Sequence, residues 1–224
     1  MAAFLALTGS VKAQQDLTTR QQAIVPIASF TAAGDMNKLD KALRDGLDAG
    51  LTIAEIKEVL THLYAYVGFP RSLNAINEFM SVLQERKDKG INDKEGRESD
   101  PLPTDKSSLE LGTEIQTRLS GTAVAGGAMA FAPAIDYYLK AHLFGDIFGR
   151  NTIRESDREI ATLSALSAMK GTDSQINSHL RYAHNAGLSE TQIWNIADVL
   201  KQRVGRKEAK RASHVFRLAY GARK

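Results

Sequence analysis

The chain has 224 residues, of which 43% are hydrophobic and 25% are charged, so it holds enough apolar material for one or two globular domains with a buried core. Its 29 lysines and arginines are balanced by 26 aspartates and glutamates, and a formal net charge of only +3 argues against a nucleic-acid-binding protein. The absence of cysteine excludes disulfides, thiolate metal sites and thiol catalysis.

The first thirteen residues resemble the end of a secretory signal peptide. A short apolar run, residues 2–7, is followed by Val11-Lys12-Ala13, which resembles a cleavage site. We expect residues 1–13 to be a truncated signal peptide, which predicts a periplasmic or secreted protein; a cytoplasmic protein with an irregular N-terminus is the alternative. No stretch approaches the roughly 20 apolar residues that a membrane span needs, so no membrane partner is expected.

The remaining sequence contains a tandem repeat. The segment LRDGLDAGLTIAEI starts at Leu43, and LRYAHNAGLSETQI starts at Leu180, 137 positions later. The same offset aligns residues over some sixty positions, including the pairs Gly34 and Gly171, Gly50 and Gly187, and Phe79 and Phe216. We interpret residues 14–91 and 113–224 as two copies of one helical unit, joined by a polar linker at residues 92–112.

Capping chemistry marks the expected helix boundaries. A hydroxyl residue followed three positions later by Glu or Gln forms a capping box, and such boxes start at Thr52, Ser156, Thr172 and Ser189. Glycines fall where the helices should end, at Gly34, Gly50, Gly171 and Gly187. Pro133 fits the first position of a helix that continues to residue 144. Strand signals are absent, so the predicted fold is all-α, a tandem duplicated helical bundle.

Four segments make the chain resemble the carboxymuconolactone decarboxylase family, which includes the alkyl hydroperoxidase D-like proteins. They are HLYAYVGFPRSLNAI (62–76), FGDIFGR (144–150), DREIATLSAL (157–166) and QINSHLRYAHNAGLSETQI (175–193). The resemblance covers nearly the whole chain apart from the N-terminal peptide and the linker, and is greatest to members that fuse two family units. It implies an alkyl hydroperoxidase D-like helical bundle and, for a fused pair, a homotrimer in which the repeats form a pseudo-hexamer.

The chemistry of this family differs between its branches. The peroxidase branch carries Cys-x-x-Cys, with the second cysteine four residues before the motif histidine. Thr172 and Gln175 occupy those positions here, so thiol peroxidase activity is excluded. The decarboxylase branch lacks the cysteines and keeps a glutamate and a histidine, which match Glu159 and His179.

The resemblance therefore implies that His179 and Glu159 are a catalytic proton-transfer pair. The first copy has Gln22 and Ala42 at the equivalent positions, so at most one complete site is expected per chain. Each residue also has a simpler interpretation. Glu159 ends the expected capping box that starts at Ser156, and we expect it to cap its helix in either case. His179 borders the apolar face of its helix and would fill the core.

Three further residues are candidates for substrate binding. His62 and Tyr66 lie four positions apart on one helix face, offset from the apolar stripe, so a partly exposed pair lining a cleft is one interpretation and packing at an interface is the other. Arg158 is the candidate for holding a substrate carboxylate, with Asp146 or Asp157 as its partner. No histidine spacing is typical of a metal site, so no metal is expected. No cofactor is expected either, because a keto- or lactone-type acid supplies its own electron sink.

Together these features predict a cofactor-independent decarboxylase, or a related lyase or isomerase, that acts on a small keto- or lactone-type carboxylic acid. This activity rests on the family resemblance. The alternative is a non-catalytic small-ligand-binding or scaffold protein of the cell envelope, because the first copy is degenerate and an export signal fits poorly with a catabolic enzyme. Solvent access to His179 favours the enzyme, whereas a ring sealed in the core favours the scaffold.

Overall fold

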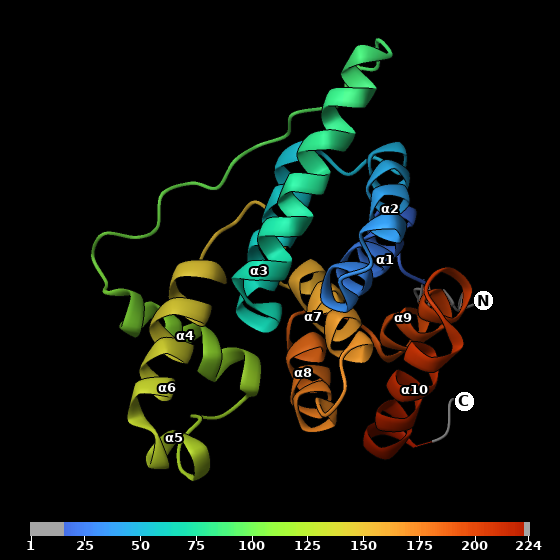
Figure 1. Cartoon of the computed structure of the whole chain (residues 1–224). Helices are drawn as coiled ribbons and strands as arrows, with labels where there is room; N and C mark the ends of the chain where they lie inside the picture. Colours follow the sequence, from blue (N-terminus) through green and yellow to red (C-terminus); the bar gives the residue numbers. More distant parts are fainter. Residues whose placement is uncertain (1–15, 222–224) are drawn as a thin grey trace, which may run out of the picture.

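The computed structural model describes residues 16–221, and this part of the chain consists of helices joined by turns and loops, without strands (Figure 1). The elements in chain order are α1 (Thr19–Ala33), α2 (Met36–Asp48), α3 (Ile53–Asp88), α4 (Ser108–Ser120), α5 (Gly127–Phe131), α6 (Pro133–Tyr137), the π-helix η1 (Tyr138–Ile147), α7 (Glu155–Ala168), α8 (Asp173–Asn185), α9 (Glu190–Arg203) and α10 (Arg206–Tyr220). The predicted all-α fold is therefore confirmed. The predicted signal peptide, 1–13, lies outside the described residues.

The duplication is visible in the backbone. Helices α1, α2 and the two halves of α3 correspond to α7, α8, α9 and α10 at the offset of 137 residues. Gly34 and Gly171, one repeat apart, have φ angles of 73° and 76°, and Gly50 and Gly187 have 91° and 96°. Left-handed backbone of this kind ends a helix at low cost only when the residue is glycine. Gly68, with φ 77°, separates the two halves of α3.

Two of the four predicted capping boxes are present. The Thr52 and Ser189 side chains each accept a hydrogen bond from the backbone N–H three residues on, and the N-cap backbone N–H in turn donates to the side-chain oxygen of that third residue. The box expected at Ser156 is wrong, because α7 starts earlier, with Arg154 at its N-cap, and Ser156 lies inside the helix. The box at Thr172 is also wrong, because its hydroxyl donates to the Leu166 carbonyl instead, at 2.8 Å.

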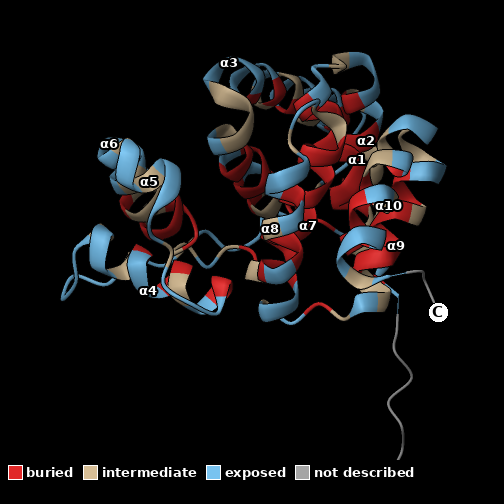
Figure 2. Cartoon of the chain, turned by 90° about the horizontal axis from the view of Figure 1, so that it is seen from below, coloured by how far each residue is buried: buried red, intermediate tan, exposed pale blue. Residues whose placement is uncertain are grey.

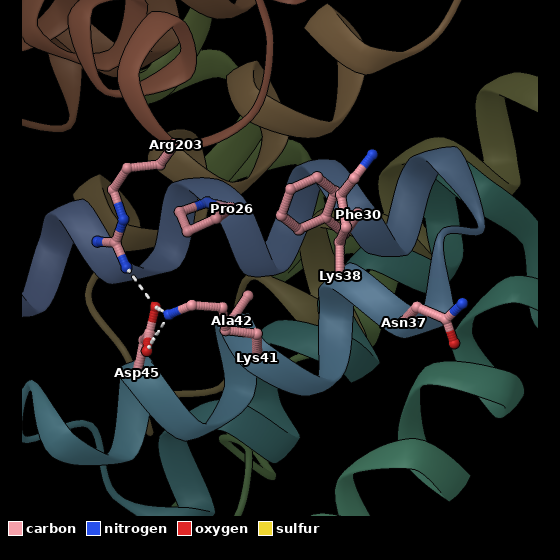
Figure 3. Close-up of a pocket in the computed structure, with 8 residues that line it drawn as sticks. All are labelled: Pro26, Phe30, Asn37, Lys38, Lys41, Ala42, Asp45 and Arg203. Atoms are coloured by element: carbon pink, nitrogen blue, oxygen red, sulfur yellow. Dashed lines mark hydrogen bonds and ion pairs between the residues drawn. The ribbon is translucent and has the colours of Figure 1, made fainter.

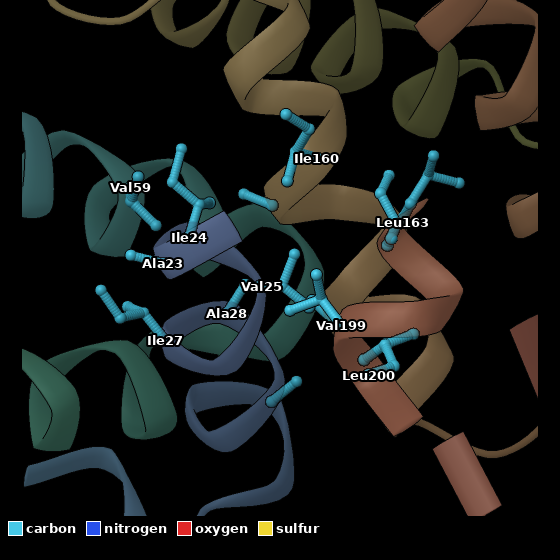
Figure 4. Packing of buried hydrophobic residues seen from close by; sticks show 14 of the residues in the cluster. Ala23, Ile24, Val25, Ile27, Ala28, Val59, Ile160, Leu163, Val199 and Leu200 are labelled. Atoms are coloured by element: carbon cyan, nitrogen blue, oxygen red, sulfur yellow. The ribbon is translucent and has the colours of Figure 1, made fainter. Parts of the chain in front are cut away.

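The core is built on the two equivalent helices α1 and α7, which pack side by side (Figure 4). Helix α1 is buried on nearly all sides because α2, α3, α7 and α9 surround it. Fully buried residues at this junction include Ile24, Val25, Ile27, Ile160 and Leu163. Each buried side chain of this size stabilises the fold by about 1.5–3 kcal/mol, so this contact accounts for much of the cohesion between the repeats.

A helical arm formed by α4, α5, α6 and η1 lies beside this core and is more exposed than it (Figures 1 and 2). Residues 91–107, which contain no helix, connect α3 to it, and α4 starts within the predicted linker, 92–112. Pro133 occupies the first position of α6, as predicted. A second apolar cluster, which includes Leu119, Phe144, Phe148 and Tyr182, fixes the arm to α8. In residues 16–221, no helix has the length and apolarity that a membrane span requires.

Candidate active site

The five predicted site residues lie together between the two repeats. Helix α3 of the first repeat carries His62 and Tyr66, α7 of the second repeat carries Arg158 and Glu159, and α8 carries His179. Ring centroids are 5.2 Å apart for His62 and Tyr66, and 5.5 Å apart for Tyr66 and His179. The tandem duplication therefore assembles within one chain a cluster to which both repeats contribute.

The His179 ring is held by Glu159. Its Nδ1 lies 2.8 Å from Oε2 of Glu159. Because an ionised carboxylate only accepts hydrogen bonds, Nδ1 is the donor, and Nε2 remains as the nitrogen that exchanges a proton. Burial raises the pKa of Glu159, and the neighbouring His179 opposes that rise. The expectation that Glu159 caps its helix is wrong, since the earlier start of α7 places this carboxylate in the interior, facing α8.

His62 and Tyr66 are neutral at physiological pH in this environment. Burial lowers the pKa of His62 well below its usual value, and the charge of Arg158 lowers it further. Burial also raises the pKa of Tyr66, with a smaller contribution from Glu159, so the phenol keeps its proton. The expectation of a partly exposed pair is wrong for His62, which is fully buried because Thr162 and Phe148 cover it. Its Nε2 lies 2.8 Å from the Thr162 hydroxyl.

Arg158 is fully buried, and its main partner is Glu58, which was not predicted from the sequence. Its Nη2 donates to Oε1 of Glu58 at 2.6 Å and to the Arg150 carbonyl at 2.9 Å. Arg150 binds the same carboxylate from the other side, at 2.9–3.0 Å. The two partners of Arg158 expected from the sequence, Asp146 and Asp157, were wrong. Asp157 pairs with Arg20 and Arg154, and Asp146 pairs with His142 of the arm. Glu58 lies one helical turn before His62 on α3, and this spacing was the sequence signal that could have identified it as a member of the cluster.

Unpartnered polar atoms are concentrated in this cluster. Ten buried side-chain nitrogen or oxygen atoms in the described part of the chain have no hydrogen-bond partner, and five of them belong to these residues. They are Nδ1 of His62, the Tyr66 hydroxyl, Nε and Nη1 of Arg158, and Oε1 of Glu159. Buried polar groups in folded proteins are almost always hydrogen-bonded, so such a concentration is typical of a site whose partners come from a bound molecule.

The cluster itself is nearly closed, since the His179 side chain is only 9% exposed. A cavity of about 340 Å³ adjoins it, and Phe148 and Arg150, which contact His62 and Glu58, form part of its wall. The same cavity is lined by Arg154 and Glu155 at the start of α7. Both arginines of this wall are paired, Arg150 with Glu58 and Arg154 with Asp157, so an anion that binds here would compete with these carboxylates.

A separate cavity of similar volume is lined by residues of α1, α2 and α9 (Figure 3). It is lined by Pro26, Phe30, Asn37, Lys38, Lys41, Ala42, Asp45 and Arg203. Asp45 lies between two of its cations, 2.8 Å from Lys41 and 3.3 Å from Arg203, so its carboxylate offsets part of their charge. This cavity contains none of the five residues of the cluster and has no comparable acid–base pair.

Comparison with protein families gives a match that covers both halves of the chain. The sequence model of the Carboxymuconolactone decarboxylase family matches residues 1–79 and 133–220, which is more than half of the chain. The first matched segment contains His62 and Tyr66, and the second contains Arg158, Glu159 and His179. No curated protein matches the chain. Two matched segments in one chain agree with the duplication seen in the backbone.

Proposed function

The chain belongs to the carboxymuconolactone decarboxylase family, and we propose that it is a cofactor-independent decarboxylase, or a related lyase or isomerase, of a small keto- or lactone-type carboxylic acid. The observation that carries the proposal is the buried pair of His179 and Glu159, with Nε2 of the imidazole left to exchange a proton. A positioned histidine contributes about 10²–10⁴-fold to a proton-transfer step. The pair lies among unpartnered donors, which the proposed substrate would engage.

In the proposed reaction the substrate supplies its own electron sink. The carbon–carbon bond to the carboxylate breaks, carbon dioxide leaves, and the electron pair moves into the neighbouring carbonyl or lactone group to form an enolate. The Tyr66 hydroxyl and two N–H-bearing nitrogens of Arg158 are buried without a hydrogen-bond partner, and in the proposed reaction they would stabilise the enolate oxygen. His179 then delivers a proton to the carbon, and Glu159 stabilises the imidazolium that precedes this transfer.

A binding or scaffold protein of the cell envelope remains the second candidate function. It is favoured by the burial of the cluster, in which Arg158 is fully enclosed and His179 is nearly so. In that case the cluster would hold a small acid, or only join the repeats, without turnover.

Release of carbon dioxide by the purified full-length chain tests the proposal. The panel consists of γ-lactone and β-keto acids. His179→Ala should reduce turnover by about 10²–10⁴-fold. The matched control is His184→Ala, an exposed position on the same helix, which should leave turnover unchanged. If the wild-type chain turns over no acid and His179→Ala only lowers stability, His179 is a packing residue and the binding protein is the better interpretation.

Tyr66→Phe separates chemistry from packing in the same assay. The phenol oxygen is buried without a partner, so removing it should leave the free energy of unfolding unchanged or raise it. Turnover should nevertheless fall, because the enolate loses one donor. A variant that keeps full activity would show that Tyr66 takes no part in the reaction.

A further inference from the structure

A second chain of hydrogen-bonded acid–base groups lies where the arm meets α3. The Tyr64 hydroxyl contacts Nε2 of His142, and Nδ1 of His142 lies 2.8 Å from Oδ2 of Asp146. Ser108 donates to the other carboxylate oxygen of Asp146. These groups are separate from the His179 cluster, and no part of the proposed decarboxylation uses them.

The direction of these hydrogen bonds follows from the chemistry of the groups. The Asp146 carboxylate only accepts, so Nδ1 of His142 carries the proton and Nε2 has a free lone pair. The Tyr64 hydroxyl is therefore the donor in its contact with Nε2. A base held by a third group and hydrogen-bonded to a hydroxyl is the arrangement that activates a nucleophile or base in many enzymes.

The backbone and neighbouring rings hold these side chains in place. His142 and Asp146 lie four positions apart on the π-helix η1, a rare conformation that is often found at functional sites. The Tyr64 ring stacks on Phe69, with centroids 4.4 Å apart and planes inclined by 29°. Since Tyr64 is fixed by α3 and His142 by the arm, the contact depends on the way the arm packs on the first repeat.

A cavity of about 270 Å³ opens onto this contact. Its lining residues are Tyr64, Ala65, Ile135, Tyr138, Leu139, His142 and Leu143. The phenols of Tyr64 and Tyr138 and the imidazole of His142 are the polar groups in a wall that is otherwise apolar. Within the described lining there is no arginine or lysine to neutralise a carboxylate. This composition favours a neutral aromatic ligand and differs from the arginine-rich surroundings of the His179 cluster.

We propose that this cavity is a second site, which binds a small neutral aromatic molecule and uses Tyr64 as its reacting group. The phenol proton passes from Oη of Tyr64 to Nε2 of His142, and Asp146 stabilises the resulting imidazolium. The electron pair left on Oη then forms a bond to an electrophilic centre of the ligand, and the leaving group of that centre departs with the electron pair of the bond that breaks. The site does not depend on the proposed decarboxylase activity, since it shares no residue with it.

Labelling with phenylmethanesulfonyl fluoride, a small neutral aromatic electrophile, tests the proposal. A bond forms between Oη and sulfur, the sulfur–fluorine bond breaks, fluoride leaves, and the phenol proton passes to His142. Peptide mapping by mass spectrometry follows each tyrosine over time. We expect Tyr64 to react at least about tenfold faster than Tyr137, although Tyr137 is 54% exposed. Equal rates, or a faster reaction at Tyr137, would overturn the proposal.

Two variants test whether His142 and Asp146, the relay that takes up the phenol proton, activate Tyr64. His142→Gln and Asp146→Asn should each slow labelling of Tyr64 about tenfold and leave the Tyr137 rate unchanged. His184→Gln is the matched control and should have no effect on either rate. Acetophenone should protect Tyr64 from the reagent, whereas benzoate should not. A Tyr64 rate that is indifferent to both relay variants, or protection by benzoate alone, contradicts the proposal.

Discussion

At the scale of single residues, the ion pair of Glu58 and Arg158 controls the charge of the candidate active site. Glu58 lies between two guanidinium groups, that of Arg158 in the interior and that of Arg150 at the cavity wall. Burial tends to raise the pKa of Glu58, but both arginines lower it, and the result is a pKa below the usual value. Burial lowers the pKa of Arg158, yet an arginine stays protonated in proteins, so the pair is ionised.

Replacing Glu58 by glutamine should therefore destabilise the protein in a pH-dependent way. At pH 7 the loss should be about 3–5 kcal/mol, because a fully buried guanidinium loses its carboxylate. The carboxylate of a folded chain with a lowered pKa contributes stability above the unfolded pKa of about 4.3, and this contribution is lost as the pH falls through the folded pKa. The difference between wild type and Glu58→Gln should thus shrink below about pH 4.3.

Urea denaturation at a series of pH values measures this difference. Glu114→Gln is the control, since its carboxylate is exposed and pairs only with Lys106 at the surface, and it should change stability little at any pH. A difference between Glu58→Gln and wild type that is the same at pH 3 and pH 7 would mean that the carboxylate charge is not what stabilises Arg158.

The members of the cluster could be predicted from the sequence, but their environment could not. Family motifs identified Glu159 and His179, and helical spacing identified His62 and Tyr66 as a pair. The burial of His62 could not be predicted, because Thr162, which covers its Nε2, is 100 residues away in the sequence. Glu58 was missed for the same reason, since its two arginines lie in the other half of the chain.

At the scale of elements, the arm depends on a close crossing of α4 and η1. Gly112 of α4 lies against the backbone at Lys140, and Gly145 of η1 lies against the backbone at Ser108. A Cβ atom at either glycine would overlap these backbone atoms. The close approach brings Phe148, at the end of η1, against His62 and so connects the arm to the candidate active site.

Gly112→Ala should destabilise the arm, although the same change on an open helix face stabilises by roughly 0.5–1 kcal/mol. Overlap with backbone cannot be relieved by a change of rotamer, so we expect a loss of about 1–3 kcal/mol. Hydrogen exchange should increase in α4 and η1 and stay unchanged in α1. Thr113→Ala, at the exposed neighbouring position, is the control and should have little effect. If Gly112→Ala were more stable than the wild type, the backbones of α4 and η1 would not be in the close contact described above.

Helices were the most predictable elements, because apolar spacing and glycine ends are local signals. The start of α7 was not, since Arg154 at its N-cap makes no side-chain cap hydrogen bond and so leaves no local signal in the sequence. Asp157 binds Gln21 and Arg20 of α1, and this contact fixes α7 in a register that leaves Glu159 free for His179. The π-helix was not predicted either, because the sequence between Tyr138 and Ile147 carries no signal that distinguishes it from an α-helix.

At the scale of the whole molecule, the two repeats share a backbone but present different surfaces. The second half of α3 exposes an apolar face formed by Phe69, Leu73, Ile76 and Met80, of which only Ile76 is partly covered. The equivalent positions on α10 are Arg206, Lys210, Ser213 and Arg217. Duplication followed by divergence has thus produced one apolar and one basic face at the same place in each repeat.

An exposed apolar face along one helix is typical of an interaction surface. We predict that this face of α3 binds further copies of the chain, in the homotrimer expected from the sequence, since closed symmetric homo-oligomers are the commonest assemblies. Sedimentation velocity of the wild-type chain should give about three times the mass of one chain. Leu73→Glu combined with Met80→Glu should give monomers, because two charges would be buried at the contact.

Lys210→Glu, at the position of α10 equivalent to Leu73, is the matched control and should leave the trimer intact.

The outcome of this experiment also bears on the active site. The apolar face follows directly after Tyr66 on α3, so a partner bound there would lie close to the buried cluster. If the wild type is a monomer at all concentrations, the apolar face of α3 serves another partner. If the double variant stays trimeric, the copies associate through a different surface.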